Sequence, residues 1–277
     1  MLVCESQVLA CPYGIDDMAT EWAKREYTSA EVDAAGNVLA DPHVEPEALD
    51  SALVVVNNWR LSHAFPLNTF QSTLRRKARQ FDPESITAQR LKRLRAIRHK
   101  LQKRTKKPIS LSAMQDIAGC RAVLKNVAQV RELQEAYIKG DLKHKLFLPI
   151  DDYISSPRIS GYRGVHLIYD YNSDKTDTWN SLKTEIQLRT QMQHAWATAV
   201  EIVGFFRQEL LKSSEGNHAW KQFFKLMATE IAIREKSPTV PGMPSNRKDL
   251  RNELRRCVTH VDALTYLHTF GQGIVDV

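Results

Sequence analysis

Four short segments in the middle of the chain have the composition of β-strands. They are Cys120 to Leu124, Leu146 to Ile150, Val165 to Tyr171 and Lys183 to Arg189. Several are rich in Val, Ile, Leu and Tyr, which favour strands, and helical patterns precede and follow them. This order predicts an α+β fold, with a mixed sheet of about five strands and flanking helices.

The region from residue 1 to about residue 75 is predicted to be mainly helical. A Ser or Thr before an acidic residue, as from Tyr27 to Glu31, is typical of a helix start. A mostly apolar run from Asp50 to Trp59 follows, and the chain is expected to break at His63.

One amphipathic helix is predicted from Pro83 to about Lys103. Apolar residues recur there at spacings of three and four, at Leu91, Leu94, Ile97 and Leu101. The opposite face would carry Lys92, Ala96, Lys100 and Lys103. A basic face of this kind is typical of a solvated helix, and it would equally suit a phosphate-binding site.

Helices are predicted again after the last strand-like segment. They run from Gln191 through Phe205, from Trp220 to Ile233 and from Lys248 to about Phe270, with a proline-containing linker from Pro238 to Pro244. We therefore expect a helical N-terminal region (1–75), a core (76–212) and a helical C-terminal region (213–277).

The charge balance favours a polyanionic partner. The chain has 39 Lys and Arg residues against 32 Asp and Glu residues, which gives a net charge of +7. A nucleotide or an RNA would suit this excess, and basic runs at Arg75 to Arg79 and Lys103 to Lys107 add to it.

Cysteine usage and hydropathy indicate a cytoplasmic protein. The four cysteines show no C-x-x-C spacing, so neither a zinc site nor a disulfide framework is suggested. No apolar run is long enough to cross a bilayer, and no signal-peptide pattern occurs, so we expect no membrane partner.

Polar side chains occupy strand positions where apolar ones would be usual. In the segment from Lys183 to Arg189, alternation places Lys183, Glu185, Gln187 and Arg189 on one face and Thr184, Ile186 and Leu188 on the other. A solvent-exposed sheet face would give the same pattern. However, Asp116 precedes another strand that contains Arg121, and two carboxylates near cations are what a Mg²⁺-nucleotide site needs.

A further polar segment runs from Ser160 to His166. Tyr162 follows Gly161, so its ring could stack on a base, although a tyrosine or a lone histidine is more often structural. Neither G-x-x-x-x-G-K-[ST] nor G-x-G-x-x-G occurs in the chain, so side chains would have to hold the phosphates of a nucleotide.

Four motifs in this order resemble those of the RelA/SpoT synthetase family, over roughly residues 80 to 212. The family's R-x-K-x(3)-S-x(3)-K element corresponds to Arg90, Lys92, Ala96 and Lys100, and its D-x-x-x-x-R element to Asp116 and Arg121. Its G-Y-x-S-x-H element corresponds to residues 161–166, and its E-x-Q-x-R-T element to residues 185–190. The resemblance implies a nucleotidyltransferase-like synthetase fold and, from the chain length, a stand-alone small alarmone synthetase.

The resemblance also implies a role for each matched residue. Arg90 and Arg121 would flank the adenine of ATP, and Lys92 and Lys100 would bind its phosphates. Asp116 and Glu185 would hold Mg²⁺, for which Mn²⁺ could substitute, and would be the catalytic pair. The acceptor would contact Tyr162, His166, Gln187 and Arg189. The reaction implied is transfer of pyrophosphate from ATP to the 3′-hydroxyl of GDP or GTP, which makes (p)ppGpp and AMP.

The chain departs from the family pattern at two positions. Ala96 and Gly164 stand where the family has serines. Each replacement removes a hydroxyl that could donate to a phosphate or orient a loop, but neither removes a metal ligand or a stacking group, so activity is still expected.

Two other functions remain compatible with the sequence. Some small members of the family are toxins that pyrophosphorylate the 3′ end of tRNA, and others use adenine nucleotides. A catalytically silent RNA-binding protein is the second alternative, against which the intact pair Asp116 and Glu185 argues. The helical flanks could build a homo-oligomer or bind an antitoxin.

Overall fold

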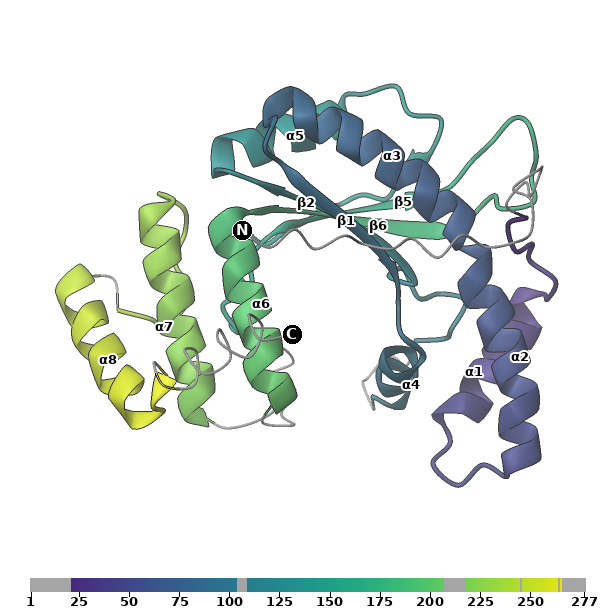
Figure 1. Ribbon diagram of the computed structural model, residues 1–277, viewed down its shortest axis with the longest axis horizontal. Helices are drawn as coiled ribbons and strands as arrows, with labels where there is room; N and C mark the ends of the chain where they lie inside the picture. The colour runs from purple at the N-terminus through teal and green to yellow at the C-terminus, as the bar shows by residue number, and fades with distance from the viewer. Residues whose placement is uncertain (1–20, 104–108, 207–217, 245, 264, 266–277) are drawn as a thin grey trace, which may run out of the picture.

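The computed structural model describes residues 21–103, 109–206, 218–244, 246–263 and 265 of the 277-residue chain. A twisted sheet lies at the centre of the molecule, with helices over one face and further helices at each end (Figure 1). This arrangement confirms the predicted α+β fold with a mixed sheet.

Six strands form one sheet within the described residues. They are β1 (Ile86–Leu91), β2 (Ala118–Leu124), β3 (Lys145–Leu146), β4 (Asp151–Asp152), β5 (Val165–Asp170) and β6 (Lys183–Thr190). The order across the sheet is β1-β2-β6-β5-β3, and β4 also pairs with β5. β2 and β6 are parallel, whereas the other pairs are antiparallel.

The prediction of one helix from Pro83 to Lys103 was wrong in its first half. Ile86–Leu91 is strand β1, which pairs along its whole length with β2, and only Leu94–Gln102 is helical (α4). Leu91 ends the strand, so the apolar spacing of three residues to Leu94 crosses a junction between two elements. Pairing with the edge of the sheet decided the structure of β1, because strand formation depends more on tertiary partners than on local sequence.

The predicted strand from Leu146 to Ile150 was also wrong over most of its length. Strand β3 ends at Leu146, with one further hydrogen bond from the Phe147 N–H to the Ile168 carbonyl, and β4 begins only at Asp151. Pro149 lies between these points, and it has no N–H group to donate to a neighbouring strand. The strands at Cys120, Val165 and Lys183 are confirmed.

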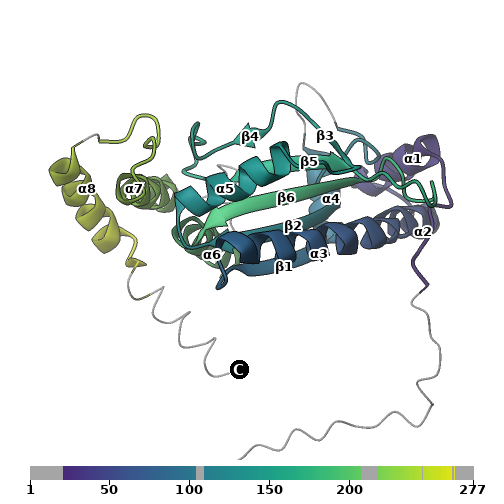
Figure 2. The same cartoon turned by 90° about the horizontal axis from the view of Figure 1, so that it is seen from above.

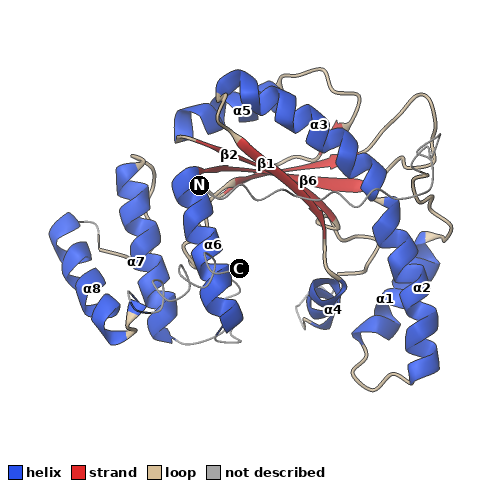
Figure 3. Ribbon diagram, viewed as in Figure 1, coloured by secondary structure: helices blue, strands red, loops and turns tan. Residues whose placement is uncertain are grey.

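Seven helices accompany α4 and the sheet in the described part of the chain (Figure 3). They are α1 (Ser29–Ala40), α2 (Pro46–Ser62), α3 (Ala64–Phe81), α5 (Val127–Ile138), α6 (Gln191–Phe206), α7 (His218–Arg234) and α8 (Arg247–His260). Thr28 caps α1 in a capping box with Glu31, as its sequence predicts, and the chain breaks at His63. α8 ends at His260, and most of the remaining predicted stretch to Phe270 (residues 264 and 266–270) lies outside the described part, as do residues 104–108 of the predicted basic run.

Alternation along β2 gives the sheet one packed face and one open face. Ala118, Cys120, Ala122 and Leu124 are buried in a core with α3 and α5, whereas Gly119 and Arg121 point the other way. Seen from above, α3 and α5 run across the same side of the sheet (Figure 2). A second core joins α1, α2 and α4, and a third joins α6, α7 and α8. The open face is therefore bounded by α4 at one end and α6 at the other.

Within the described residues, no helix combines the length and the apolar character that crossing a membrane requires.

Candidate active site

The open face of the sheet carries a pocket with a volume of about 460 Å³. Its floor consists of two neighbouring rows of paired residues. One row places Arg90 beside Gly119 and Gly119 beside Glu185. The next row places Arg121 beside Gln187 and Gln187 beside His166. Because side chains two positions apart on a strand share a face, both rows point into the same pocket.

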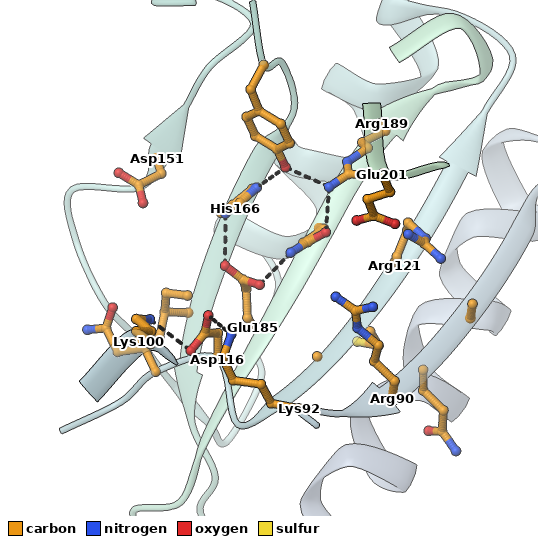
Figure 4. Close-up of a pocket in the computed structure, with 18 of the residues that line it drawn as sticks. Arg90, Lys92, Lys100, Asp116, Arg121, Asp151, His166, Glu185, Arg189 and Glu201 are labelled. Carbon is orange, nitrogen blue, oxygen red and sulfur yellow. Dashed lines mark hydrogen bonds and ion pairs between the residues drawn. The ribbon is translucent and has the colours of Figure 1, made fainter. Parts of the chain in front are cut away.

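The pocket walls bring together all ten residues that the sequence analysis selected. These are Arg90, Lys92, Lys100, Asp116, Arg121, Tyr162, His166, Glu185, Gln187 and Arg189. They come from β1, β2, β5, β6, α4 and three loops (Figure 4). Their individual roles remain predictions, but none of them lies away from the pocket.

Asp116 lies at one end of the pocket between two lysines. Lys92 Nζ lies 2.8 Å from Asp116 Oδ2, and Lys100 Nζ lies 2.9 Å from Oδ1. Burial would raise the pKa of the Asp116 carboxyl group, but the two ammonium groups outweigh burial and hold the pKa below its usual value. The carboxylate is therefore ionised at neutral pH, and two cations stand beside it.

A closed ring of five hydrogen-bonded side chains occupies the other part of the pocket. Arg189 donates to Tyr162 Oη and to Gln187 Oε1, each at 2.8 Å. Gln187 Nε2 donates to Glu185 Oε2 at 2.5 Å. Tyr162 Oη lies 2.5 Å from His166 Nε2, and His166 Nδ1 lies 2.9 Å from Glu185 Oε1 (Figure 4).

The donors in this ring fit one consistent direction. The Tyr162 hydroxyl accepts from Arg189 and can donate its own proton to His166 Nε2, and the tautomer of His166 that accepts this bond carries its N–H on Nδ1, facing Glu185. Burial would raise the pKa of Glu185, but the hydrogen bonds from His166 and Gln187 outweigh burial and the pKa is lowered. Glu185 is thus held as an oriented carboxylate.

Arg90 and Arg121 form a cationic end of the pocket. Burial lowers the pKa of Arg121, and the positive charges of Arg189 and Arg90 lower it further. An arginine still stays charged at any ordinary pH, so these groups repel one another when no anion or π-face lies between them. This end is suited to a planar, electron-rich ligand.

Several polar pocket residues were missed by the sequence analysis, namely Gln89, Gln115, Asp151, Arg158 and Glu201. Arg158 belongs to the loop before Gly161 and lies with its guanidinium 4.2 Å from the centroid of the Tyr153 ring. Glu201 comes from α6, where it is the one acidic residue. No local pattern marked either residue, because α6 also carries polar residues such as Gln193 and His194, and Arg158 lies in a polar loop.

The departure at Gly164 has a local explanation. Its φ is +150°, and a Cβ atom there would lie 3.3 Å from Arg189 Cγ and from the carbonyl oxygen of Leu188. A serine would therefore crowd the arginine that closes the hydrogen-bonded ring. Glycine at this position allows the close approach.

The carboxylates of the pocket fit a hard divalent cation. No group of three or more His, Cys, Asp or Glu side chains in the described part of the chain could hold a metal alone. Asp116 and Glu185 are both ionised, and both face the pocket. Mg²⁺ is commonly held by one or two carboxylates together with water and substrate phosphates, so this pair matches its requirements.

Comparison with known proteins points to one family. A family model described as a region found in RelA / SpoT proteins matches residues 89–203. Of two related proteins in Bacillus subtilis (strain 168), the GTP pyrophosphokinase YwaC is 27% identical over 164 residues, which cover 54% of this chain and 76% of YwaC. The GTP pyrophosphokinase YjbM is 30% identical over 118 residues, which cover 42% of this chain and 54% of YjbM.

Solved structures with the same fold include two small alarmone synthetases from Bacillus subtilis. Synthetase 2 matches with a TM-score of 0.54 and 21% identity, covering 65% of this chain and 94% of that one. Synthetase 1, bound to its product pppGpp, matches with a TM-score of 0.54 and 22% identity, covering 65% of this chain and 92% of that one. At this identity the likeness shows a common fold.

Proposed function

The chain, whose residues 89–203 belong to the RelA/SpoT family, is a pyrophosphokinase, and we propose that it transfers the β,γ-diphosphate of ATP to the 3′-hydroxyl of GDP or GTP. The products would be AMP and ppGpp or pppGpp. The observation that carries the proposal is one pocket in which the Asp116 carboxylate lies between two lysines and the Glu185 carboxylate belongs to an oriented ring of polar side chains. We further propose that the protein acts in the cytoplasm.

We assign the donor to Arg90, Lys92, Lys100 and Arg121. The two guanidinium groups would flank the adenine, and the two lysines would bind the transferred phosphates. In the structure, Asp116 forms an ion pair with each of these lysines. Phosphate oxygens would compete for these lysines, which would free the Asp116 carboxylate for another cation.

We assign Mg²⁺ to Asp116 and Glu185. When bound, the ion would neutralise charge on the phosphates and act as a Lewis acid toward the transferred group. The carboxylate of Glu185 would accept the proton of the attacking 3′-hydroxyl. Charge in phosphoryl transfer spreads over the non-bridging oxygens, so positioning and nearby cations supply most of the catalysis.

We assign the acceptor to Tyr162 and to the hydrogen-bonded side chains that fix its hydroxyl group. Hydrogen bonds to His166 and Arg189 hold the Tyr162 hydroxyl, and Arg189 also lies 5.0 Å from the centroid of its ring. A fixed aromatic ring can stack on a base at little cost in entropy. The same ring of side chains reaches Glu185, so base binding and orientation of the carboxylate would be linked.

Transfer of label identifies the acceptor directly. The protein is incubated with Mg²⁺ and ATP labelled at the γ-phosphate, and separately with GDP, GTP, AMP, ADP and deacylated tRNA. We expect label on GDP and GTP. Label only on tRNA or on an adenine nucleotide would replace the guanine assignment, and absence of label from every acceptor would contradict pyrophosphate transfer.

Replacing Tyr162 by Ala is expected to weaken acceptor use far more than ATP binding. Loss of one base stack costs about 1–3 kcal/mol, so KM for the acceptor should rise by roughly 5- to 150-fold. The Tyr162→Phe variant keeps the ring and serves as the control. Steady-state kinetics with each substrate varied in turn measures both constants, and an equal loss of ATP affinity in Tyr162→Ala would refute the assignment to the acceptor.

Replacing Arg90 or Arg121 by Ala is expected to raise KM for ATP by about tenfold, because each guanidinium would stack on one face of the adenine. KM for the acceptor should change little. Arg75→Ala, which removes an exposed arginine of α3 on the other side of the sheet, is the control. An unchanged KM for ATP in both site variants would show that the adenine binds elsewhere.

A further inference from the structure

One short segment after α7 contacts the chain on both sides of the proposed acceptor position. The segment comprises residues 235–238, and we call it the α7 end. Tyr162 and Arg189 line the pocket and meet at the Tyr162 hydroxyl, to which Arg189 donates at 2.8 Å. The residue that follows each of them in the chain, Arg163 or Thr190, is buried and forms hydrogen bonds with the α7 end.

Arg163 joins the loop of Tyr162 to the α7 end. Its guanidinium donates to the Ser237 hydroxyl at 3.2 Å and to the Pro238 carbonyl oxygen. The loop also packs directly on α7, because a Cβ atom on Gly161 would lie 2.8 Å from a side-chain carbon of that helix. The loop side of the acceptor position is therefore tied to α7 by buried contacts.

Glu235 joins the end of β6 to the same segment. Its two carboxylate oxygens accept hydrogen bonds from the Thr190 hydroxyl and from Gln193 Nε2, the latter at 2.8 Å. Thr190 and Gln193 also bond to each other, because the backbone N–H of each donates to the side chain of the other, at 3.2 and 3.1 Å. Bonds to a charged acceptor among buried groups are stronger than neutral ones, so Glu235 fixes the point where β6 passes into α6.

The charge of Glu235 acts on both sides of the acceptor position. Burial lowers the pKa of Arg163, and the negative charge of Glu235 opposes that shift. A buried cation without a counter-charge is costly, so Glu235 stabilises Arg163 while its hydrogen bonds hold the end of β6. Glu235 lies outside residues 89–203, which match the family model.

We propose that Glu235 is a positioning residue for the acceptor, which sets the separation of Tyr162 and Arg189 from outside the pocket. The inference rests on the proposed function, because it requires the acceptor at Tyr162. Arg189 donates to the Tyr162 hydroxyl and to Gln187, and Gln187 donates to Glu185. Loss of Glu235 would let the loop and the end of β6 move apart, and this series of contacts would loosen.

Steady-state kinetics of Glu235 variants tests the proposal. In Glu235→Ala, kcat/KM for GDP and GTP should fall by about ten- to a hundredfold, mainly through KM, because displacing a substrate-binding group by about 1 Å has effects of this size. KM for ATP should stay nearly unchanged, since Lys100 belongs to α4, at the opposite end of the open face from α6 and α7 (Figure 1). Glu235→Gln keeps the volume and one acceptor oxygen, and it should restore most of the loss.

The matched control is Glu230→Ala on the same helix. Glu230 is 6% exposed and pairs with Arg234 and Arg247, each at 3.1 Å, so its loss should also destabilise α7. These two arginines do not line the pocket. A variant that only lowers stability reduces the amount of active protein and hence the apparent kcat, so KM for the acceptor should stay at its wild-type value in Glu230→Ala.

Thr190→Val tests the same contact from its other side. The substitution removes the hydroxyl that donates to Glu235, so it should raise KM for the acceptor even if Glu235→Ala does not fold. In the double variant the two losses of free energy should be less than additive, because both substitutions break one contact. The proposal is overturned if KM for the acceptor rises no more in Glu235→Ala and Thr190→Val than in Glu230→Ala, or if KM for ATP rises equally. A wild-type protein that transfers to no guanine nucleotide would instead refute the proposed function, and the positioning role with it.

Discussion

The variants Asp116→Asn and Glu185→Gln are each expected to abolish pyrophosphate transfer and to keep the fold. Each substitution conserves volume and removes one negative charge from the proposed metal site. Asp116→Asn also leaves Lys92 and Lys100 without their carboxylate, and Glu185→Gln leaves one uncharged acceptor oxygen for the two donors His166 and Gln187. Rates are measured with labelled ATP, and circular dichroism reports the fold.

The same experiment includes three further measurements. The double variant should be no slower than either single variant, because a site broken once has little left to lose. Transfer should require Mg²⁺ or Mn²⁺ and should stop when a chelator is added. Glu132→Gln, which alters an exposed carboxylate of α5 behind the sheet, should retain full activity. Retention of more than about a tenth of the wild-type rate in both single variants, a loss of only ~1.4 kcal/mol, would mean that the metal binds elsewhere.

Replacing Arg163 by Ala is expected to lower the free energy of unfolding by about 2–4 kcal/mol. The side chain is 2% exposed, and its guanidinium donates to the carbonyl oxygens of Ile154 and Pro238 and to Ser237 Oγ. Removal would leave buried carbonyl groups without donors and would open a cavity between the Tyr162 loop and the end of α7. Urea denaturation followed by tryptophan fluorescence measures the loss.

The control for this prediction is Arg158→Ala, which removes an exposed arginine from the same loop. Its free energy of unfolding should stay within about 0.5 kcal/mol of the wild-type value. If Arg163→Ala loses no more than Arg158→Ala, the buried contacts of Arg163 do not stabilise the fold, and the loop must be held by other means.

The central strands of the sheet could be predicted because buried and pocket-facing positions alternate along their sequences. In β6, Thr184, Ile186 and Leu188 are fully buried, and Glu185 and Gln187 face the pocket, as alternation requires. A strand with one face in the core and one face in a polar site must alternate in this way. The same alternation predicted that Glu185 and Gln187 share one polar face of β6.

The edge strand β1 could not be predicted because nothing in its own sequence requires a strand. Its residues alternate poorly between buried and exposed positions, and it has only β2 as a neighbour. Arg90 was assigned to a helix for this reason, although its place in the pocket was expected from its motif. The contribution of α6 depends on how that helix packs against the sheet, and no local pattern encodes such packing, so Glu201 was missed.

β6 is the last strand of the described sheet to be synthesised, yet it lies between β2 and β5. A nascent chain that ends before residue 183 already contains Asp116 and the basic residues assigned to the donor. It lacks Glu185, and it lacks the strand that lies between β2 and β5 in the sheet. The parallel pairing of Gly119 with Glu185 joins distant parts of the chain, and such contacts form late in folding. With Glu185 in its proposed role, a nascent chain that has not reached β6 would lack one of the two proposed catalytic carboxylates and would transfer no pyrophosphate.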